Sequence, residues 1–267
     1  MKLAVFGASG RMGLALINAI SLNEKTTLSG ALDSSTSDKI GEDSGIVAGL
    51  TANNIPISAD VDTVLDQVDG IIDFTIPQAT LSLAQKTAQR GLVHIIGTTG
   101  LDDTQEAELQ KAAEKAIIVK SGNMSLGVNL LSALVKKVAS SLDEAFDIEI
   151  VEMHHKHKVD APSGTALLLG EAAAQGREIK LSDRSVMSRE GYTGARKEGD
   201  IGFATLRGGS VVGDHSVIFA GEFERIELTH LAQDRGIFAN GAVKAALWAQ
   251  NKQPGYYTML DVLGIQD

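Results

Sequence analysis

Three of the six histidines in this 267-residue chain fall within four positions, at 154, 155 and 157, and two lysines lie beside them. Histidine can give or take a proton near neutral pH, and lysine can act as an acid or hold a carboxylate. Residues 162–165 then read Pro-Ser-Gly-Thr, which predicts the start of a helix. The free backbone N–H groups of that helix, with the Thr165 hydroxyl, can bind an anion. The segment therefore predicts a site that binds a small polyanion and supplies a proton.

Three other interpretations of this segment stay open. The histidines could hold a zinc ion, but the neighbouring lysines oppose a cation and no other element offers an obvious ligand. The segment could be a solvated basic strand end, and Ser163 could serve only to cap the following helix. In an extended chain, His155 and His157 would share one face, and His154 and Lys156 the other. We favour the anion site and expect no metal.

A glycine-rich motif near the start of the chain has the pattern of a dinucleotide site. Residues 7–13 read Gly-Ala-Ser-Gly-Arg-Met-Gly and lie between a short apolar run and a helical pattern. Such glycines permit a tight turn and the close approach of a pyrophosphate to the helix N-terminus. Arg11 could flank a phosphate or simply face solvent. The pattern favours NAD(P) binding, although a glycine-rich turn without a cofactor is also compatible with it.

An acidic residue supports the dinucleotide interpretation. Asp33 follows Gly13 by 20 residues, at the end of a second predicted strand, where a carboxylate can hydrogen-bond the ribose hydroxyls of the cofactor. It would repel a 2′-phosphate, and Ser34 follows it, with Lys39 the nearest cation. We therefore expect NADH to be preferred over NADPH. An exposed turn aspartate is the alternative.

Two further loops follow predicted strands. Residues 97–100 read Gly-Thr-Thr-Gly, and residues 121–124 read Ser-Gly-Asn-Met. Ligands bind doubly wound sheets at the carboxyl ends of the strands, so we expect both loops to line the nicotinamide half of the site. Each loop is also compatible with turn chemistry alone, and Asp73 with a simple strand end.

Alternating strands and helices must position these loops. β-rich apolar runs alternate with helical patterns, which predicts βαβ units and a doubly wound parallel sheet over about the first 125 residues. The expected strands are 3–6, 27–32, 71–74, 93–96 and 117–119, and the expected helices are 12–20, 78–90 and 102–115.

The pattern changes in the second half of the chain. Three strand candidates follow one another without helices between them, which predicts an antiparallel sheet and an α+β domain. Residues 177–200 are polar and glycine-containing, as in a long loop. The expected helices are 126–142, 166–174 and 237–249, and the expected strands are 146–153, 202–206, 216–220 and 225–231. We predict a dinucleotide-binding domain over 1–125 and 236–267, and a substrate-binding and tetramerisation domain over 126–235.

Composition excludes several kinds of protein. The formal net charge is −10, which argues against a nucleic-acid partner. The chain has no cysteine, so disulfides, thiolate nucleophiles and iron–sulfur clusters are excluded. The first apolar run is too short for a signal peptide, and no run approaches a membrane span. We expect a cytoplasmic protein that does not bind membranes.

Several motifs together resemble one known family. They cover essentially the whole chain and match the dihydrodipicolinate reductases of lysine biosynthesis, which reduce 4-hydroxy-tetrahydrodipicolinate. The matching motifs are GASGRMG at 7–13, DFT at 73–75, GTTG at 97–100, EMHHKHKVDAPSGTA at 152–166, REGYTGAR at 189–196, IGFATLRGG at 201–209 and GDHSVIFAGEFERIELTH at 213–230.

The resemblance implies an NAD(P)H-dependent oxidoreductase that acts on a small cyclic dicarboxylate, as a homotetramer built through the second domain. By motif position, His154 corresponds to the proton donor/acceptor and Lys158 to a second proton donor, while His155, Gly164 and Thr165 would bind a substrate carboxylate. The residues that would line the cofactor are Gly7, Ala8, Ser9, Gly10, Arg11, Met12, Asp33, Gly97, Thr98, Thr99, Ser121, Gly122, Asn123 and Met124.

The chain departs from many relatives at one position. Those relatives place an arginine after the acidic ribose residue, where this chain has Ser34. A strong NADPH preference is therefore not expected. Two rival functions are a related dehydrogenase acting on aspartate or homoserine, and a non-enzymatic NAD(P)-sensing protein, but neither explains the histidine–lysine segment.

Overall fold

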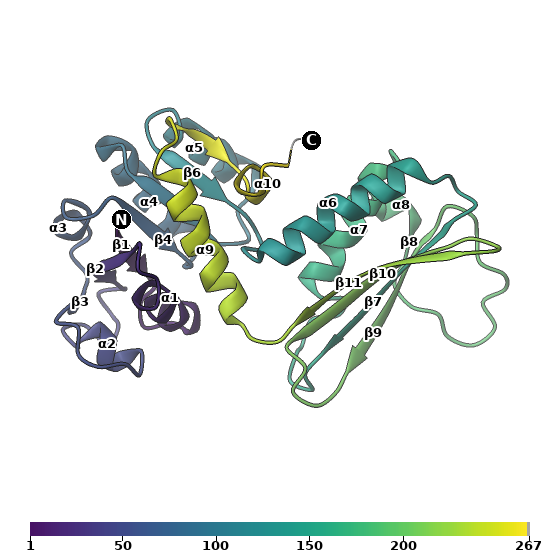
Figure 1. Cartoon of the computed structure of the whole chain (residues 1–267), viewed down its shortest axis with the longest axis horizontal. Coiled ribbons are helices and arrows are strands. Elements are labelled where there is room, and N and C mark those ends of the chain that lie inside the picture. The colour runs from purple at the N-terminus through teal and green to yellow at the C-terminus, as the bar shows by residue number, and fades with distance from the viewer. Residues whose placement is uncertain (266–267) are drawn as a thin grey trace. The chain divides into compact units, whose positions relative to one another are not determined.

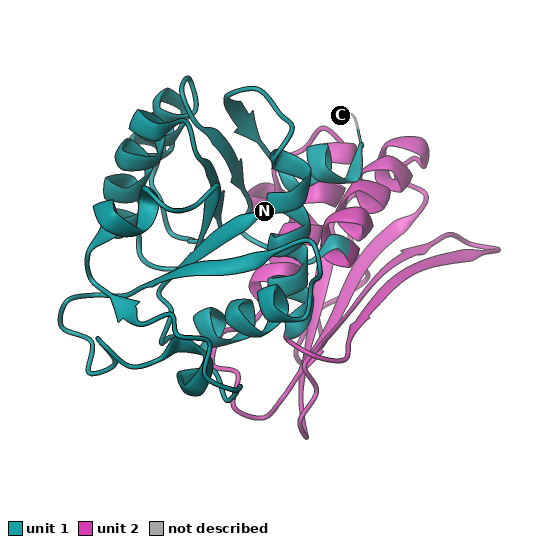
Figure 2. Cartoon of the chain, turned by 60° about the vertical axis from the view of Figure 1, so that its left-hand side comes forward, with its two compact units in different colours: residues 1–126, 236–267 teal, residues 127–235 magenta. Residues whose placement is uncertain are grey.

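The computed structural model describes residues 1–265 and divides into two compact units (Figure 2). The first unit contains residues 1–126 and the chain from Gly236 onward, and the second contains Gly127–Arg235. Among the described residues, no helix is both long and apolar enough to cross a bilayer.

A seven-stranded, fully parallel sheet forms the centre of the first unit, in the order β12-β6-β5-β4-β1-β2-β3 (Figure 1). The strands are β1 (Lys2–Phe6), β2 (Thr27–Leu32), β3 (Ile57–Ser58), β4 (Gly70–Asp73), β5 (Val93–Ile96), β6 (Ile117–Lys120) and β12 (Gly255–Tyr257). The helices are α1 (Arg11–Ser21), α2 (Ser44–Val47), α3 (Val61–Leu65), α4 (Pro77–Arg90), α5 (Asp103–Ala112), α9 (Gly236–Ala249) and α10 (Met259–Leu263).

Helices cover both faces of this sheet, because successive strand residues point to opposite sides. On one face, Leu3 and Val5 pack with α1 and α9. On the other, Ala4 and Ile71 pack with α3 and α4, and Ile118 packs with α4 and α5. The predicted doubly wound parallel sheet is confirmed. The sequence patterns missed the short elements α2, α3, β3, β12 and α10.

Glycines shape the turn after β1. Gly7 adopts φ +79°, a conformation that favours glycine. A Cβ on Gly13 would lie 2.1 Å from the Gly7 carbonyl oxygen, so α1 approaches the turn as closely as a glycine allows. The turn therefore leaves β1 and enters α1 directly, the arrangement that brings a phosphate to a helix N-terminus.

The second unit contains a five-stranded sheet in the order β11-β10-β7-β9-β8. Its strands are β7 (Asp147–His154), β8 (Ser185–Val186), β9 (Ile201–Arg207), β10 (Gly213–Ala220) and β11 (Arg225–Ala232). Its helices are α6 (Leu126–Ser141), α7 (Gly164–Gly176) and α8 (Leu181–Arg184). Residues 187–200 form the greater part of the predicted 177–200 loop, but α8 and β8 lie within the segment and were not predicted.

The predicted α+β domain is confirmed, but its sheet is mixed, and the predicted antiparallel pairing holds among the three candidate strands only for β10 with β11. Strand β9 pairs in parallel with β7 and with β8, and only β10 pairs antiparallel, with β7 and β11. The segment between β7 and β9 contains α7 and α8, and a helical crossover returns the chain parallel to the strand that it left. Strands β9 and β10 are consecutive in sequence, yet β7 lies between them.

One face of the mixed sheet packs under α7, with Ile148, Ile150, Phe203 and Phe219 in its core. The alternation of β7 continues along this row to Glu152 and His154, which are both buried. On the opposite face, Leu206 is 50% exposed and Leu231 62% exposed. The inner row therefore carries the polar site, whereas the outer face carries apolar side chains at the surface.

Candidate active site

The predicted proton carrier His154 sits at the end of the buried row of β7, with a side-chain exposure of 10%. Its Nδ1 lies 2.6 Å from Oε2 of Glu152, two residues earlier on the same face. Glu152 is only 1% exposed. A carboxylate beside one ring nitrogen fixes the orientation of an imidazole, so this contact leaves Nε2 for exchange with a ligand.

Glu152 is held by two further donors. Arg207 on β9 donates from Nη1 to Oε2 at 2.8 Å and from Nη2 to Oε1 at 2.9 Å. The backbone N–H of Ser163 donates to Oε1 at 3.1 Å. Burial opposes ionisation of Glu152, but the hydrogen bonds from Arg207 and His154 outweigh it and hold the pKa of this carboxyl below its usual range. The buried group is therefore a carboxylate.

The chain after His154 turns instead of continuing as a strand. Lys158 N–H donates to the His155 carbonyl at 3.1 Å, which closes a tight turn. The predicted division of His154–His157 between two faces of an extended chain is therefore wrong. Lys158 Nζ pairs with Asp160 Oδ1 at 2.8 Å, and Arg207 donates to the Asp160 carbonyl at 2.7 Å. Arg207 thus links the Lys158 turn to the carboxylate that contacts His154.

His155 lies at the surface of the same segment. Its Nε2 is 3.2 Å from Nη2 of Arg235, and its backbone N–H donates to the Val211 carbonyl at 2.7 Å. Partial burial and the positive charge of Arg235 lower the pKa of His155. Nδ1 of this imidazole accepts from the His157 N–H at 3.2 Å, and Arg235 places a cation beside Nε2.

Helix α7 begins where Glu152 anchors the chain. Ser163 caps the helix, since its Oγ accepts from the Ala166 N–H at 3.1 Å, and Gly164 and Thr165 form the first turn. Ser163 does more than cap the helix, because the same Oγ also lies within hydrogen-bond distance of His215, 2.9 Å from its Nε2. The first turn of α7 and His154 are thus tied to one carboxylate, Glu152.

His215 lies beside His154, the predicted proton carrier. Its ring meets that of His154 edge-on, with centroids 5.0 Å apart. Burial, reinforced by the charge of His154, lowers the pKa of His215 to about 4. His215 is therefore neutral near pH 7 and acts as a hydrogen-bond partner of Ser163.

In the first unit, Asp33 is bound to the glycine-rich turn. Its Oδ2 accepts from the Ser9 N–H at 2.8 Å and from Ser9 Oγ at 2.6 Å, while Oδ1 accepts from the Ser34 N–H at 2.8 Å. The carboxylate therefore has hydrogen-bond partners, and the alternative of a plain exposed turn aspartate is excluded. Ala8 is fully buried, and Arg11 is exposed. The narrow turn and the acidic group beside it fit the adenosine half of an NAD(P) molecule.

The loops after β4 and β5 are joined by buried hydroxyl groups. Asp73 Oδ1 accepts from Thr75 Oγ1 at 2.6 Å and from Thr98 Oγ1 at 3.4 Å, and Thr98 Oγ1 accepts from the Thr75 N–H at 3.0 Å. The fully buried His94 lies 3.4 Å from Asp73. Asp73 is therefore more than a strand end. A Cβ on Gly97 would lie 2.3 Å from the Phe74 ring, so the two loops are also in van der Waals contact.

Several of the predicted cofactor residues do not offer their side chains. Thr98 is 2% exposed and Met124 1% exposed, so their side chains are buried in the fold. Thr99 and Gly122 are exposed. Ser121 Oγ donates to the Asn123 carbonyl at 2.7 Å, which shapes the loop after β6. The remaining predicted residues belong to the turn after β1: Gly7, Gly10 and Met12.

Sequence reasoning missed four residues of the second unit's site: Glu152, Arg207, His215 and Arg235. Glu152 had a detectable signal, because it lies near the end of the predicted strand 146–153 and shares a face with His154 once that strand is extended by one residue, as β7 is. The other three come from distant strands and from the chain end of the unit. Their positions depend on the strand order, which the sequence patterns do not give.

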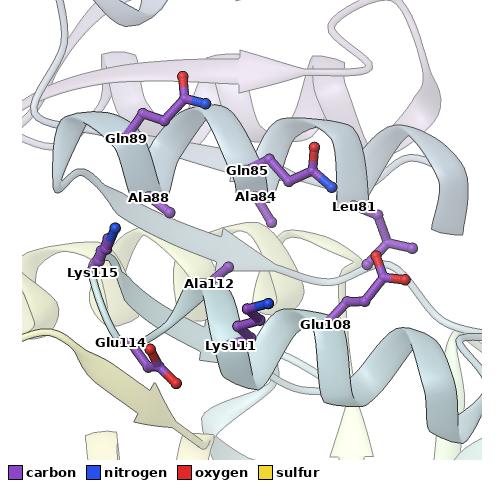
Figure 3. A pocket seen from close by; sticks show the side chains of 10 residues that line it. All are labelled: Leu81, Ala84, Gln85, Ala88, Gln89, Glu108, Lys111, Ala112, Glu114 and Lys115. Atoms are coloured by element: carbon purple, nitrogen blue, oxygen red, sulfur yellow. The ribbon is translucent and has the colours of Figure 1, made fainter.

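An open groove of about 620 Å³ between α4 and α5 contains none of the predicted site residues (Figure 3). Its lining includes the small apolar residues Ala84, Ala88 and Ala112 and the charged residues Lys111 and Glu108. The groove lies on the helix surface of the first unit, and its lining residues Glu114 and Lys115 come just before the amino-terminal end of β6. Within residues 1–265, no three histidine or carboxylate side chains converge as a metal site requires.

These features define a class of protein: a Rossmann-type dinucleotide-binding unit joined to a second unit with a histidine-centred polar site. Models of two halves of one family match the chain, "Dihydrodipicolinate reductase, N-terminus" over residues 1–124 and "Dihydrodipicolinate reductase, C-terminus" over residues 127–263. The chain belongs to the dihydrodipicolinate reductase family and is an oxidoreductase. The predicted family and enzyme class are confirmed.

Curated relatives agree over the whole length. A 4-hydroxy-tetrahydrodipicolinate reductase of Rhodopseudomonas palustris (strain BisA53) is 63% identical over 265 residues, covering 99% of this chain and 97% of that protein. A 4-hydroxy-tetrahydrodipicolinate reductase of Bradyrhizobium diazoefficiens is 56% identical, and the match covers 100% of this chain and 98% of that protein. A dipicolinate-bound dihydrodipicolinate reductase from Paenisporosarcina sp. TG-14 superposes with a TM-score of 0.79 at 23% identity, covering 98% of both chains. The last match supports the fold.

The buried His215 predicts an acid-sensitive stability. Between pH 6.5 and about 4, the unfolded chain binds a proton at this residue and the folded chain does not, so the free energy of unfolding falls as the pH falls. Over this window the loss is on the order of 3 kcal/mol. His215→Phe removes the group. Urea unfolding at several pH values should show a shallower decline for the variant, and parallel declines would contradict the assignment.

Proposed function

We propose that the protein reduces 4-hydroxy-tetrahydrodipicolinate to tetrahydrodipicolinate with loss of water, using NAD(P)H, in the route to diaminopimelate and lysine. The observation that carries the proposal is the single network that joins His154, the Lys158 turn and the first turn of α7 through Glu152 and Arg207. Proton donors and an anion seat are thereby held together, as the reduction of a cyclic dicarboxylate requires.

The residues of the second unit divide the work between proton supply and substrate binding. His154 acts as proton donor and acceptor through Nε2, and Lys158 is the second proton donor. The backbone N–H groups of Gly164 and Thr165 hold one substrate carboxylate at the N-terminus of α7, where the helix dipole favours negative charge. His155, whose Nε2 lies 3.2 Å from Nη2 of Arg235, adds a polar and a cationic group beside this carboxylate-binding site.

The first unit binds the cofactor, which supplies the hydride when bound. The turn at 7–13 holds the pyrophosphate, and Asp33 accepts from the ribose hydroxyls. The loops at 97–99 and 121–124 line the nicotinamide side. Asp33 followed by Ser34 favours NADH, because a carboxylate repels the 2′-phosphate of NADPH and no arginine follows it.

We also propose a homotetramer assembled through the outer face of the second unit's sheet. Leu206 is 50% exposed and Leu231 62% exposed on that face, and exposed large apolar side chains are typical of interaction surfaces. Arg189 covers part of the face through a bidentate ion pair with Glu149, with N–O distances of 2.9 and 2.7 Å.

A cytoplasmic location fits the proposed pathway and stays an expectation.

The role of His154 predicts a separation of turnover from binding. His154→Ala should lower kcat roughly 10²- to 10⁴-fold, the usual loss when a general acid is removed. The dissociation constants for NADH and dipicolinate should change little, because the backbone seat and the cofactor turn are intact. Steady-state kinetics and calorimetry measure the two quantities. The matched control is His157→Ala, an exposed neighbour. Wild-type turnover in His154→Ala would refute the acid–base role.

The cofactor preference predicts a response to charge beside Asp33. Ser34→Arg should raise the NADPH-to-NADH ratio of kcat/KM roughly tenfold, because a guanidinium can pair with the 2′-phosphate. Ser34→Ala is the control, since it removes the hydroxyl without adding a cation. Initial rates with each cofactor give the ratio. A ratio that does not change in Ser34→Arg would mean that this position does not contact the ribose.

A further inference from the structure

We propose that Glu152 and Arg207 form a positioning pair that sets which nitrogen of His154 carries the exchangeable proton and holds the Lys158 turn against the start of α7. The inference rests on the proposed function, because it gives these two residues a task in the same reaction. Neither residue needs to touch the substrate. Both act through His154, Lys158 and α7.

The first step concerns the hydrogen on the imidazole. Both oxygens of Glu152 are engaged: Oε2 by His154 Nδ1 at 2.6 Å and Arg207 at 2.8 Å, and Oε1 by Arg207 at 2.9 Å and Ser163 N–H at 3.1 Å. An ionised carboxylate only accepts hydrogen bonds. The Nδ1 of His154 must therefore carry a hydrogen, and Nε2 is left as the nitrogen that exchanges a proton.

The second step concerns the space beside Nε2. A Cβ on Gly213 would lie 2.9 Å from this nitrogen, so the glycine keeps free the volume that a side chain would fill. The neighbouring His215 does not serve as a partner for His154, because its Nε2 lies 2.9 Å from Ser163 Oγ. Nε2 of His154 thus faces Gly213, where the absence of a side chain leaves space beside the imidazole.

The third step concerns the reach of Arg207. In the parallel pairing of β7 with β9, Arg207 is the register partner of His154, so its side chain lies on the same inner face and reaches back to Glu152. The same guanidinium donates to the Asp160 carbonyl at 2.7 Å, and Asp160 pairs with Lys158 at 2.8 Å. One arginine therefore connects both proposed proton donors.

The fourth step concerns cost. A buried carboxylate that lost its cation would be strongly destabilising, whereas an apolar pair of similar volume would fill the same space without that risk. Stability alone therefore does not explain why the chain keeps this buried ion pair. Its contacts with His154, α7 and the Lys158 turn indicate that it orients these groups.

Glu152→Gln tests the pair, because the amide has the same shape without the charge. Nitrogen-15 shifts of ring-labelled histidine at pH 8, assigned with His154→Ala, should place the hydrogen of wild-type His154 on Nδ1. In Glu152→Gln the population should move toward the Nε2–H form that free histidine favours. The variant's kcat should fall roughly 10²-fold, by analogy with carboxylates that orient other catalytic histidines, with little change in the dissociation constants for NADH and dipicolinate.

Glu149→Gln is the matched control. It removes another arginine-paired carboxylate from the same strand, but from the outer face, so the His154 spectrum should not change. Arg207→Lys is the second variant, in case Glu152→Gln does not fold. It keeps Glu152 and a cation, so the hydrogen should stay on Nδ1, while kcat falls because the contact with Asp160 is lost.

An Nε2–H form of wild-type His154, or an unchanged His154 spectrum in folded Glu152→Gln, would overturn the proposal. Wild-type kcat in Arg207→Lys would overturn its second half. The spectra do not depend on turnover, so they decide the role of Glu152 even if the protein fails to reduce the proposed substrate.

Discussion

The buried carboxylate of Glu152 is the constraint on which the second unit depends. A carboxylate that is 1% exposed is stable only when its oxygens are fully paired. Its donors come from β7, β9 and the start of α7, so three elements must meet at one point. Once they do, His154 and the anion seat are fixed relative to each other. Two strands of one sheet and a helix N-terminus thereby become a site.

The two units use their sheets differently. In the first unit, parallel strands end at one edge, and the turns after β1, β4, β5 and β6 are the proposed cofactor-binding segments. In the second unit, the site lies along the inner face of the mixed sheet, and alternation places Glu152 and His154 in one row.

Much of the fold and part of the candidate site could be predicted from the sequence, and the elements and residues that were missed have physical explanations. Strands 27–32 and 93–96 were predicted with the observed bounds. Strand β5 is buried at all four positions and is rich in β-branched residues, which favour strands. Strand β12 was missed, since Gly255–Tyr257 is only partly buried. Local motifs around His154 indicated the candidate site. Arg207 is 55 residues from Glu152, and no local pattern predicts that pairing before the strand order is known.

The most direct test of the central claim is a coupled turnover assay of the wild-type protein. The substrate is generated in place from pyruvate and aspartate semialdehyde by the synthase that condenses them, and nicotinamide absorbance is followed. The account predicts oxidation of NADH that requires both precursors and saturates with the condensation product. Protein that binds NADH but gives no precursor-dependent oxidation would contradict it, and the second unit would then serve a different ligand.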